Sequence, residues 1–303
     1  MKIARTISEA RAFINELRQQ QEGSAAGRIV GFVPTMGYLH EGHASLLRRS
    51  RQESGISVLS IFVNPIQFGP NEDLDRYPRS EEADLQLAER EGVDVVFLPS
   101  VEEMYPEERR TTVTVTGVTE RLCGASRPGH FDGVATVVSK LFNIIKPDKA
   151  FFGAKDAQQV AVLQKMVKDL NMDVDIVPCP IVREEDGLAL SSRNAYLSEE
   201  QRREALVLSR SLREASIRIQ TEDVTPQQIV DDVTQAIQTS PIAEIDYVEM
   251  LSFPDLAPIH PEHGLSELRA SGGSAILALA VKFGSTRLID NAIMKLKEAP
   301  LHV

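Results

Sequence analysis

The sequence predicts an α/β protein with a mostly parallel β-sheet that helices cover on both faces, followed by a smaller α+β domain. Through the first two thirds of the chain, short apolar runs rich in β-branched residues alternate with amphipathic runs of helical period, which is the pattern of a parallel sheet. Past about Ser198 two helices, 199–220 and 226–238, come in succession before any strand. A chain of 303 residues has room for two domains, and we place them at 1–189 and 190–303.

Each element of the first domain has its own signal. Thr6 and Glu9 form a capping box, and apolar residues then recur at helical spacing to give a first helix. Pro34 cannot donate to a sheet and should stop the first strand. The predicted strands cover 28–33, 56–63, 93–98, 149–152 and 174–177, with an edge strand or hairpin arm at Thr111–Thr116. The predicted helices between them cover 42–54, 80–91, 133–145 and 156–170.

The second domain should contain three strands, the last two joined as a hairpin. The predicted strands cover 245–251, 275–283 and 287–289, and Gly284-Ser285 is a typical hairpin turn. Gly187 lies just before this domain and can absorb a change of backbone conformation. We therefore expect the small domain to act as a lid.

Composition limits the classes of partner. The chain has 33 basic and 44 acidic residues, for a net charge of −11, which argues against nucleic acid as a partner but allows a local basic pocket for phosphates. The scarce cysteines, Cys123 and Cys179, exclude a disulfide framework and fit a reducing compartment. No apolar run is long enough for a signal peptide or a membrane span, so we expect a cytoplasmic protein.

The turn between the first strand and the next helix carries the strongest chemical signal. Gly37 lets the backbone turn, and His40 and His43 then stand three residues apart at the start of a helix that begins near Gly42. This spacing puts both imidazoles on one side of the first helical turn. Because a helix N-terminus offers unpaired N–H groups and a positive dipole end, the pair can bind an anion such as a triphosphate. Two solvated histidines are an alternative of equal weight. A zinc site is a weaker one, because the HExxH spacing and a nearby cysteine are missing.

This stretch resembles a known family. Residues 39–43, LHEGH, resemble the HIGH-type signature of the nucleotidyltransferase superfamily, and 34–43, PTMGYLHEGH, resemble the first motif of the pantothenate synthetase (pantoate–β-alanine ligase) family. The resemblance implies a Rossmann-like fold and a site for ATP. It assigns ATP contacts to Met36, Gly37, Tyr38, Leu39, His40, Glu41, Gly42 and His43.

Two amides follow the second strand. Asn64 and Gln67 offer donors and acceptors without charge, which suits a substrate that carries hydroxyls. On the residues alone, a turn with incidental polar side chains is an equal alternative. Residues 62–69, FVNPIQFG, resemble the family motif whose glutamine contacts pantoate near the β-alanine site. The resemblance therefore makes Gln67, together with Asn64, substrate-binding.

Acidic residues gather next, at 71–79, NEDLDRYPR, and at 81–84, EEAD. Carboxylates here suit Mg²⁺, which needs only one or two of them beside phosphates and water. A solvated acidic helix start, favoured by the helix dipole, is the simpler interpretation. The family has adjacent aspartates as metal ligands in this region, whereas Ala83 precedes Asp84 here. We expect Mg²⁺ as a cofactor and assign no metal ligands.

Two later stretches each lead into a helix. Residues 127–134, RPGHFDGV, resemble a loop of the family, and we assign them no catalytic part. Residues 152–159, FGAKDAQQ, place Lys155 where it can reach phosphates and Asp156 where it can cap a helix or hold a ribose hydroxyl. A lysine in a surface turn is the alternative. The stretch resembles the family motif FGxKDxQQ, in which the second glutamine binds pantoate. The resemblance assigns ATP contacts to Gly153, Ala154, Lys155 and Asp156, and a pantoate contact to Gln159.

The last stretch, 190–194, LSSRN, follows an acidic turn at 185–187. Two hydroxyls and an arginine in succession form a compact set of donors for phosphate oxygens. A serine that caps the next helix is the alternative. LSSRN resembles the family's counterpart of the KMSKS loop. The resemblance assigns ATP contacts to Val182, Leu190, Ser191, Ser192 and Arg193.

Together these motifs cover most of residues 28–200 and imply a ligase. It would join pantoate and β-alanine through a pantoyl adenylate and release AMP and pyrophosphate, as a homodimer. The expected catalytic residues are His40, His43, Lys155 and Arg193. A nucleotidyltransferase that stops at an adenylated or cytidylylated product is the alternative enzyme, and Gln67 and Gln159 argue against it because its substrates usually need cationic contacts. A nucleotide-binding module without turnover is the alternative of a different class.

Overall fold

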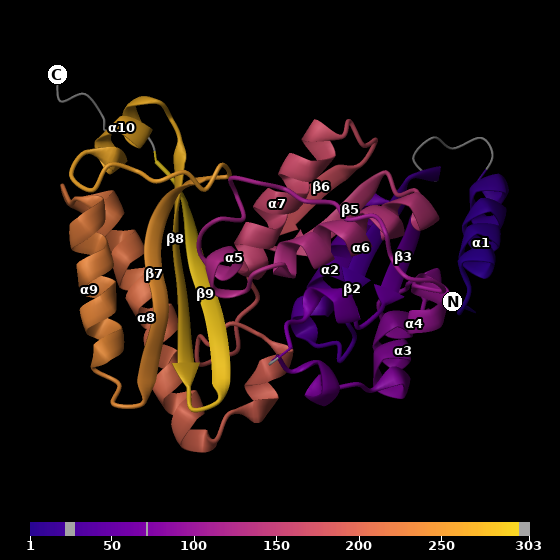
Figure 1. Cartoon of the computed structure of the whole chain (residues 1–303), viewed down its shortest axis with the longest axis horizontal. Coiled ribbons are helices and arrows are strands. Elements are labelled where there is room, and N and C mark those ends of the chain that lie inside the picture. Colours follow the sequence, from indigo (N-terminus) through magenta and orange to yellow (C-terminus); the bar gives the residue numbers. More distant parts are fainter. Residues whose placement is uncertain (22–27, 71, 297–303) are drawn as a thin grey trace. The chain divides into compact units, whose positions relative to one another are not determined.

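The computed structural model describes residues 1–21, 28–70 and 72–296, which pack as two compact units (Figure 1). Of the described residues, the first unit comprises those in 1–115, 127–154 and 162–182, and the second comprises those in 116–126, 155–161 and 183–296. Three short segments that the sequence prediction assigned to the first domain, 116–126, 155–161 and 183–189, therefore pack with the C-terminal part. The domain boundary at 189/190 and the lid role of the second domain stay predictions.

The first unit is built on a six-stranded sheet, and every strand pairs in parallel with its neighbours. In spatial order the strands are β1 (Lys2–Ala4), β4 (Val95–Phe97), β3 (Ile56–Ile61), β2 (Val30–Thr35), β5 (Lys149–Gly153) and β6 (Asp175–Cys179). The predicted parallel sheet is confirmed. The short strand β1 was not predicted, because its three residues are specified by pairing with β4 rather than by a pattern of their own.

Helices cover both faces of this sheet. Phe32 in β2 packs edge-on against Phe142, with ring centroids 6.4 Å apart, whereas Val33 packs with Leu46 and Leu47. Because successive side chains of a strand point to opposite faces, these contacts place α6 on one face and α2 on the other. The helices of this unit include α1 (Ile7–Gln20), which packs beside α6 (His130–Ile145), and α2 (Glu41–Glu53), which packs beside α3 (Glu81–Arg90).

Strand β2 continues through Pro34, so the prediction that this proline stops the strand is wrong. Backbone groups of a parallel strand face its two neighbours in alternation. The carbonyl of Val30 accepts from the N–H of Asp148, on the β5 side, and Pro34, four residues on, faces the same side. Strand β2 pairs with β5 only at Gly31 and Phe32. Pro34 therefore lies beyond the part of β2 that pairs with β5, where the ladder does not need its N–H.

The predicted strand at Thr111–Thr116 is wrong as well, since this segment is extended but belongs to no sheet. Buried and exposed side chains do alternate in this segment, because Val115 is buried while Thr114 and Thr116 are exposed. The partner is a helix, however, and the N–H of Val113 donates to Oγ1 of Thr136 in α6 at 3.0 Å. An alternating pattern specifies a half-buried extended segment, but it does not specify a strand beside it.

The second unit packs two helices on an antiparallel sheet of order β7-β8-β9. Ser198 and Thr225 cap the helices with complete capping boxes. The elements are α8 (Glu199–Thr221), α9 (Pro226–Gln238), β7 (Ala243–Phe253), α10 (Gly264–Ala270), β8 (Ser274–Phe283) and β9 (Thr286–Lys295). The predicted hairpin is confirmed, with Gly284 at φ 61° in its turn. Strand β9 is longer than predicted because buried polar residues, Asp290 and Asn291, interrupt its apolar run.

The remaining helices of the described chain are short except for α7 (Ala157–Asp169). No helix in the described ranges is long and apolar enough to cross a membrane. The other remaining helices are η2 (Pro65–Gln67), η3 (Leu74–Arg76), α4 (Val101–Met104), α5 (Cys123–Ser126), η4 (Ala154–Asp156) and η5 (Ser192–Tyr196).

Candidate active site

The carboxyl ends of three adjacent strands bring the predicted site segments of the first unit together. Strands β3, β2 and β5 are neighbours, and they lead into 62–67, 36–43 and Ala154, respectively. The chain winds outward from β2 through β3 and β4 and then returns to β5 on the other side. This reversal is a topological switch point, where ligands of open α/β sheets bind beyond the strand ends.

His40 and His43 lie at the N-terminus of α2, one as the N-cap and one in the first turn. The helix begins at Glu41, one residue before the predicted start. The two imidazole rings are close, with centroids 4.1 Å apart, as their spacing of three residues requires. Nδ1 of His40 accepts from the N–H of Gly42 at 3.1 Å, and Nδ1 of His43 accepts from the N–H of His40 at 3.2 Å.

These two hydrogen bonds fix the tautomer of each ring. A backbone N–H can only donate, so each Nδ1 must be unprotonated and act as the acceptor. A neutral imidazole then carries its proton on Nε2. Both histidines are therefore neutral donors at Nε2, at the positive end of a helix.

Asp84 holds the turn that leads into the histidines. Its carboxylate accepts from the N–H of Tyr38 at 2.9 Å and from the N–H of Leu39 at 2.6 Å. The preceding residue, Gly37, has φ 85°, and a Cβ there would lie 3.0 Å from Oδ2 of Asp84. Burial raises the pKa of Asp84, although its two amide donors act in the opposite direction. The turn thus needs both a residue without a side chain at 37 and an acceptor at 84.

This placement corrects the interpretation of 81–84 as a solvated acidic helix start. Glu81 and Glu82 are exposed as expected, but Asp84 is only 2 % exposed and faces the turn. The sequence pattern missed this role because the contact joins residues 46 positions apart. Within 72–79 the charged residues include Glu72, which pairs with Arg127, while Asn71 lies outside the described residues.

The amides that follow β3 contact each other. Nδ2 of Asn64 donates to Oε1 of Gln67 at 3.0 Å and to the carbonyl of Gly133 at 3.3 Å, while its Oδ1 accepts from the hydroxyl of Tyr105 at 2.8 Å. Burial raises the pKa of Tyr105 to about 12, so its hydroxyl remains a donor. Asn64 is thus used within the protein to orient Gln67. Nε2 of Gln67 points to Sδ of Met36 at 3.2 Å, which is a weak acceptor.

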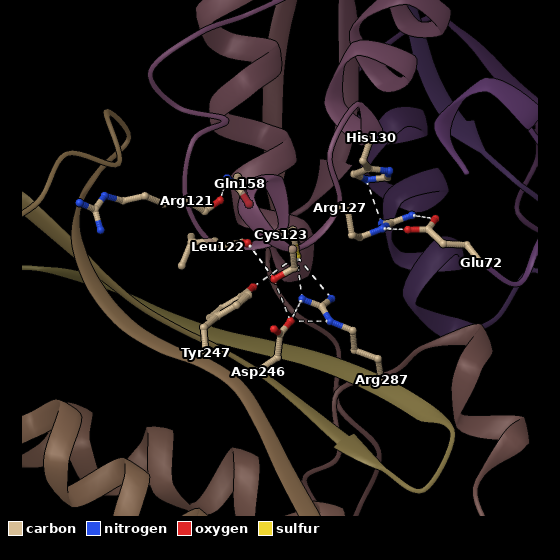
Figure 2. Close-up of polar contacts among 11 residues, drawn as sticks. Glu72, Arg121, Leu122, Cys123, Arg127, His130, Gln158, Asp246, Tyr247 and Arg287 are labelled. Carbon is tan, nitrogen blue, oxygen red and sulfur yellow. Dashed lines mark hydrogen bonds and ion pairs between the residues drawn. The ribbon is translucent and has the colours of Figure 1, made fainter. Parts of the chain in front are cut away.

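The loop at 127–134, to which we assigned no catalytic part, supports the backbone of Gln67. Figure 2 shows the side chains of Arg127 and His130 from this loop together with that of Glu72. Arg127 pairs through two hydrogen bonds with Glu72, at 2.7 and 2.5 Å, and contacts Nε2 of His130 at 3.0 Å. A guanidinium only donates, so Nε2 of His130 accepts and Nδ1 carries the proton. Nδ1 then donates to the carbonyl of Gln67 at 2.9 Å.

Gly133 allows the same loop to approach η2 closely. A Cβ at this position would lie 2.4 Å from the carbonyl oxygen of Ile66 and 2.6 Å from Cα of Gln67. Gly153, at the end of β5, is the opposite case, because a Cβ there would meet nothing within 4 Å. The sequence signal for this support was the RPGHFDG stretch itself, but only the structure shows what it contacts.

Lys155, Asp156 and Gln159 belong to the second unit. Lys155 and Gln159 are half-buried and Asp156 is exposed. The carbonyl of Lys155 accepts from Nδ2 of Asn291 at 2.8 Å.

The other glutamine of this motif, Gln158, is buried. It donates to the carbonyls of Val118 and Arg121 at 3.0 and 2.7 Å. The first glutamine of the pair is therefore part of the fold, while the second is the one that sequence reasoning selected as a ligand.

The stretch Leu190–Arg193 also belongs to the second unit, whereas Val182 is the last residue of the first. Oγ of Ser191 accepts from the N–H of Arg193 at 3.2 Å, and Ser192 is 8 % exposed. The neighbouring Asn194 donates to Glu184 at 2.9 Å. The two stretches of this unit that we predicted to bind ATP are thus held by different contacts.

Glu184 in turn pairs with Arg202 through hydrogen bonds at 3.1 and 2.7 Å. The hydrogen bond from Arg202 lowers the pKa of Glu184. This carboxylate therefore stays ionised and gives the loop at 190–194 a fixed anchor on α8.

A second cluster in the C-terminal unit holds the segment 116–126 on its sheet (Figure 2). Sγ of Cys123 lies 3.3 Å from the hydroxyl of Tyr247 and 3.6 Å from Nη1 of Arg287, which itself pairs with Asp246 at 2.6 Å. Ser126 also donates to Asp246, at 2.9 Å. These contacts explain why a segment from the middle of the chain packs with the C-terminal unit.

Among the described residues no group of three His, Cys, Asp or Glu side chains could hold a metal ion. Both carboxylate oxygens of Asp84 face backbone N–H groups. A magnesium ion that arrives with ATP would therefore draw most of its ligands from phosphate oxygens and water, as magnesium commonly does.

The fold and these strand ends define a doubly wound α/β protein with a topological switch point, the place where proteins of this class bind ligands. Comparison with known proteins then gives the family. A model of the pantoate-beta-alanine ligase family matches residues 2–293, and the chain belongs to this family. The prediction that it is a pantoate–β-alanine ligase is confirmed, as is the predicted fold class.

Individual relatives agree along nearly the whole chain. The pantothenate synthetase of Acetivibrio thermocellus is 57% identical, over 97% of this chain and 100% of its own, and that of Pelotomaculum thermopropionicum is 55% identical over 97% and 99%. The crystal structure of the Thermus thermophilus pantothenate synthetase is 43% identical, with a TM-score of 0.85 over 98% of this chain and 100% of its own. A pantoate–β-alanine ligase structure from Francisella tularensis, complexed with β,γ ATP and β-alanine, is 32% identical with a TM-score of 0.76 over 97% of each chain.

Proposed function

We propose that this ligase condenses pantoate with β-alanine through a pantoyl adenylate and releases AMP and pyrophosphate, in the synthesis of a coenzyme A precursor. The observation that carries the proposal is the pair of neutral Nε2–H donors at the N-terminus of α2, set by the bonds to Nδ1 of His40 and His43. Donors of this kind can stabilise charge on phosphate oxygens without a proton transfer. A relative was crystallised in complex with β,γ ATP and β-alanine, which supports ATP and β-alanine as two of the three substrates.

The first step forms a bond between a pantoate carboxylate oxygen and the α-phosphorus of ATP, and pyrophosphate leaves with the electrons of the broken P–O bond. The chain contributes alignment and charge stabilisation. We assign the phosphate contacts to His40, His43, Lys155, Ser192 and Arg193, and the adenine contact to Val182. Mg²⁺ bound to the phosphates would add neutralising charge.

The pantoate contacts are assigned to Gln67 and Gln159. Nε2 of Gln67 faces the thioether of Met36, a weak acceptor, so a hydroxyl or carboxylate of pantoate would be a better acceptor for it. In the second step the amine of β-alanine attacks the acyl carbon and a C–N bond forms. AMP leaves with the electrons of the broken C–O bond, and the amine gives up a proton to solvent. The expected homodimer and cytoplasmic location remain part of the proposal.

Without β-alanine, pyrophosphate should form from ATP and pantoate in an amount of about one equivalent per site, because a reactive adenylate must stay bound and shielded from water. A rapid-quench assay with labelled ATP measures this burst, and addition of β-alanine should restore turnover. Omission of pantoate is the control and should give no burst. Repeated turnovers at an equal rate in the absence of β-alanine would contradict the proposal.

A further inference from the structure

Two adjacent polar residues are buried in the middle of β9 in the second unit, between Ile289 and Ala292. Asp290 is 3 % exposed and Asn291 is 5 % exposed, and in β9 they stand opposite Leu279 and Ala278 of β8. Burying an amide or a carboxylate is costly unless its hydrogen bonds are satisfied. Apolar residues at these positions would extend the existing pattern of the strand, so the polar pair calls for a specific contact on each side.

Each of the two residues contacts a different segment. Successive side chains of a strand point to opposite faces, and the contacts follow this rule. The carboxylate of Asp290 accepts from Nη1 and Nη2 of Arg183 at 2.6 and 3.0 Å, whereas Nδ2 of Asn291 donates to the carbonyl of Lys155 at 2.8 Å. Strand β9 thereby holds the side chain of Arg183, which follows Val182, and also the backbone of Lys155.

The contact with Lys155 acts on its main chain. A hydrogen bond to this carbonyl fixes the orientation of the peptide group between Lys155 and Asp156, at the entrance to α7. The direction in which the long lysine side chain leaves the backbone depends on that orientation. The contact joins residues 136 positions apart in the sequence, so no local pattern could indicate it.

We propose that Asn291 is a positioning residue for Lys155: it holds the lysine backbone so that the ammonium group is directed at the phosphates of ATP. This inference rests on the proposed function, since it assumes that Lys155 contacts the nucleotide. Asn291 acts through Lys155 and does not itself touch a substrate. Asp290 fixes the register of the same strand through its charged pair with Arg183.

A double-mutant cycle with Lys155→Ala tests the inference. Asn291→Ala, and the isosteric Asn291→Asp, which lacks the N–H donor, should each lower kcat/KM for ATP on the order of 10-fold in the parent enzyme. In the Lys155→Ala background the same changes should alter the residual kcat/KM by less than about 2-fold, because residues that act as a unit are not additive. The KM for β-alanine should not change in either background.

Gln158→Ala is the matched control, because it removes another buried amide that donates to backbone carbonyls of the same unit. Its effect should be the same in both backgrounds. Equal effects of the Asn291 changes with and without Lys155 would overturn the inference and leave Asn291 a structural residue. If the parent enzyme forms no pantothenate, the proposed function fails instead.

A second measurement does not depend on activity. Competitive acylation of lysines, followed by mass spectrometry of the peptide that contains Lys155, reports how strongly ATP protects this side chain. Protection should fall at least about 3-fold in Asn291→Asp and stay at the parent level in Gln158→Ala, because a ligand stabilises a conformation only through contacts specific to it. Full protection in Asn291→Asp would overturn the inference even if the alanine variant failed to fold.

Discussion

Replacing His43 with alanine should lower kcat for pyrophosphate formation by about 10²–10³-fold while changing the apparent affinity for ATP much less. The reason is the fixed tautomer of the ring. Nδ1 accepts from the N–H of His40, so the proton on Nε2 is directed to charge that grows on phosphate oxygens in the transition state. Stopped-flow detection of pyrophosphate, with ATP and pantoate varied separately, measures both quantities.

Two further variants separate the chemistry from the capping of α2. His40→Asn keeps a side-chain acceptor for the N–H of Gly42, since asparagine is a good N-cap, but it removes the Nε2 donor and should slow the reaction to a similar extent. His260→Ala changes another histidine whose Nδ1 accepts backbone N–H groups, in the second unit, and should leave kcat unchanged. Normal turnover of the His43 variant would contradict a catalytic role and favour the alternative that both histidines are solvated residues at a helix start.

Gly133→Ala should destabilise the protein by about 1–3 kcal/mol, the usual cost of overpacking, and raise the KM for pantoate at least about 10-fold. At an ordinary helical position alanine would instead be more favourable than glycine by up to about 1 kcal/mol. At position 133 alanine should instead lower the free energy of unfolding, because the new Cβ would lie 2.4 Å from the carbonyl oxygen of Ile66 and 2.6 Å from Cα of Gln67. Chemical denaturation and steady-state kinetics with varied pantoate measure the two effects.

Gly69→Ala is the matched control for this substitution. It lies close to the same 3-10 helix, but a Cβ there has its nearest neighbour, Cδ of Glu72, at an ordinary contact distance of 3.7 Å. Its free energy of unfolding should stay within about 0.5 kcal/mol of the parent value, as for most substitutions without a clash. A Gly133→Ala protein as stable as the control, with the parent KM for pantoate, would show that the close approach of α6 does not position Gln67.

Local sequence signals predicted the elements that local physics determines. The capping box at Thr6, the helical period and the Gly284 turn all act within a few residues. Such signals were therefore sufficient for the parallel sheet and for the hairpin of the second unit. They were insufficient where the partner is distant, as at 111–116, whose backbone bonds to a helix and not to a strand.

In the candidate site, too, the sequence predicted local contacts and missed contacts between distant residues. The spacing of His40 and His43 predicted their proximity, because one turn of a helix sets it, and the structure confirms it. Asp84, His130 and Asn291 were missed because each acts on a backbone group that lies between 46 and 136 residues away. Even where such a residue lies in a recognisable stretch, as His130 does, the sequence does not indicate its partner, since the residue at the other end of the hydrogen bond contributes only its main chain.

The most direct test of the proposed reaction is the fate of oxygen from the pantoate carboxylate. Pantoate labelled with oxygen-18 in both carboxylate positions is allowed to react with ATP and β-alanine. The products are then separated, and the oxygen-18 content of each is measured by mass spectrometry. Attack of the carboxylate on the α-phosphorus predicts one labelled oxygen in the phosphate of each AMP and the other in pantothenate, with none in pyrophosphate. Label found in inorganic phosphate, or AMP free of label while pantothenate forms, would contradict a pantoyl adenylate.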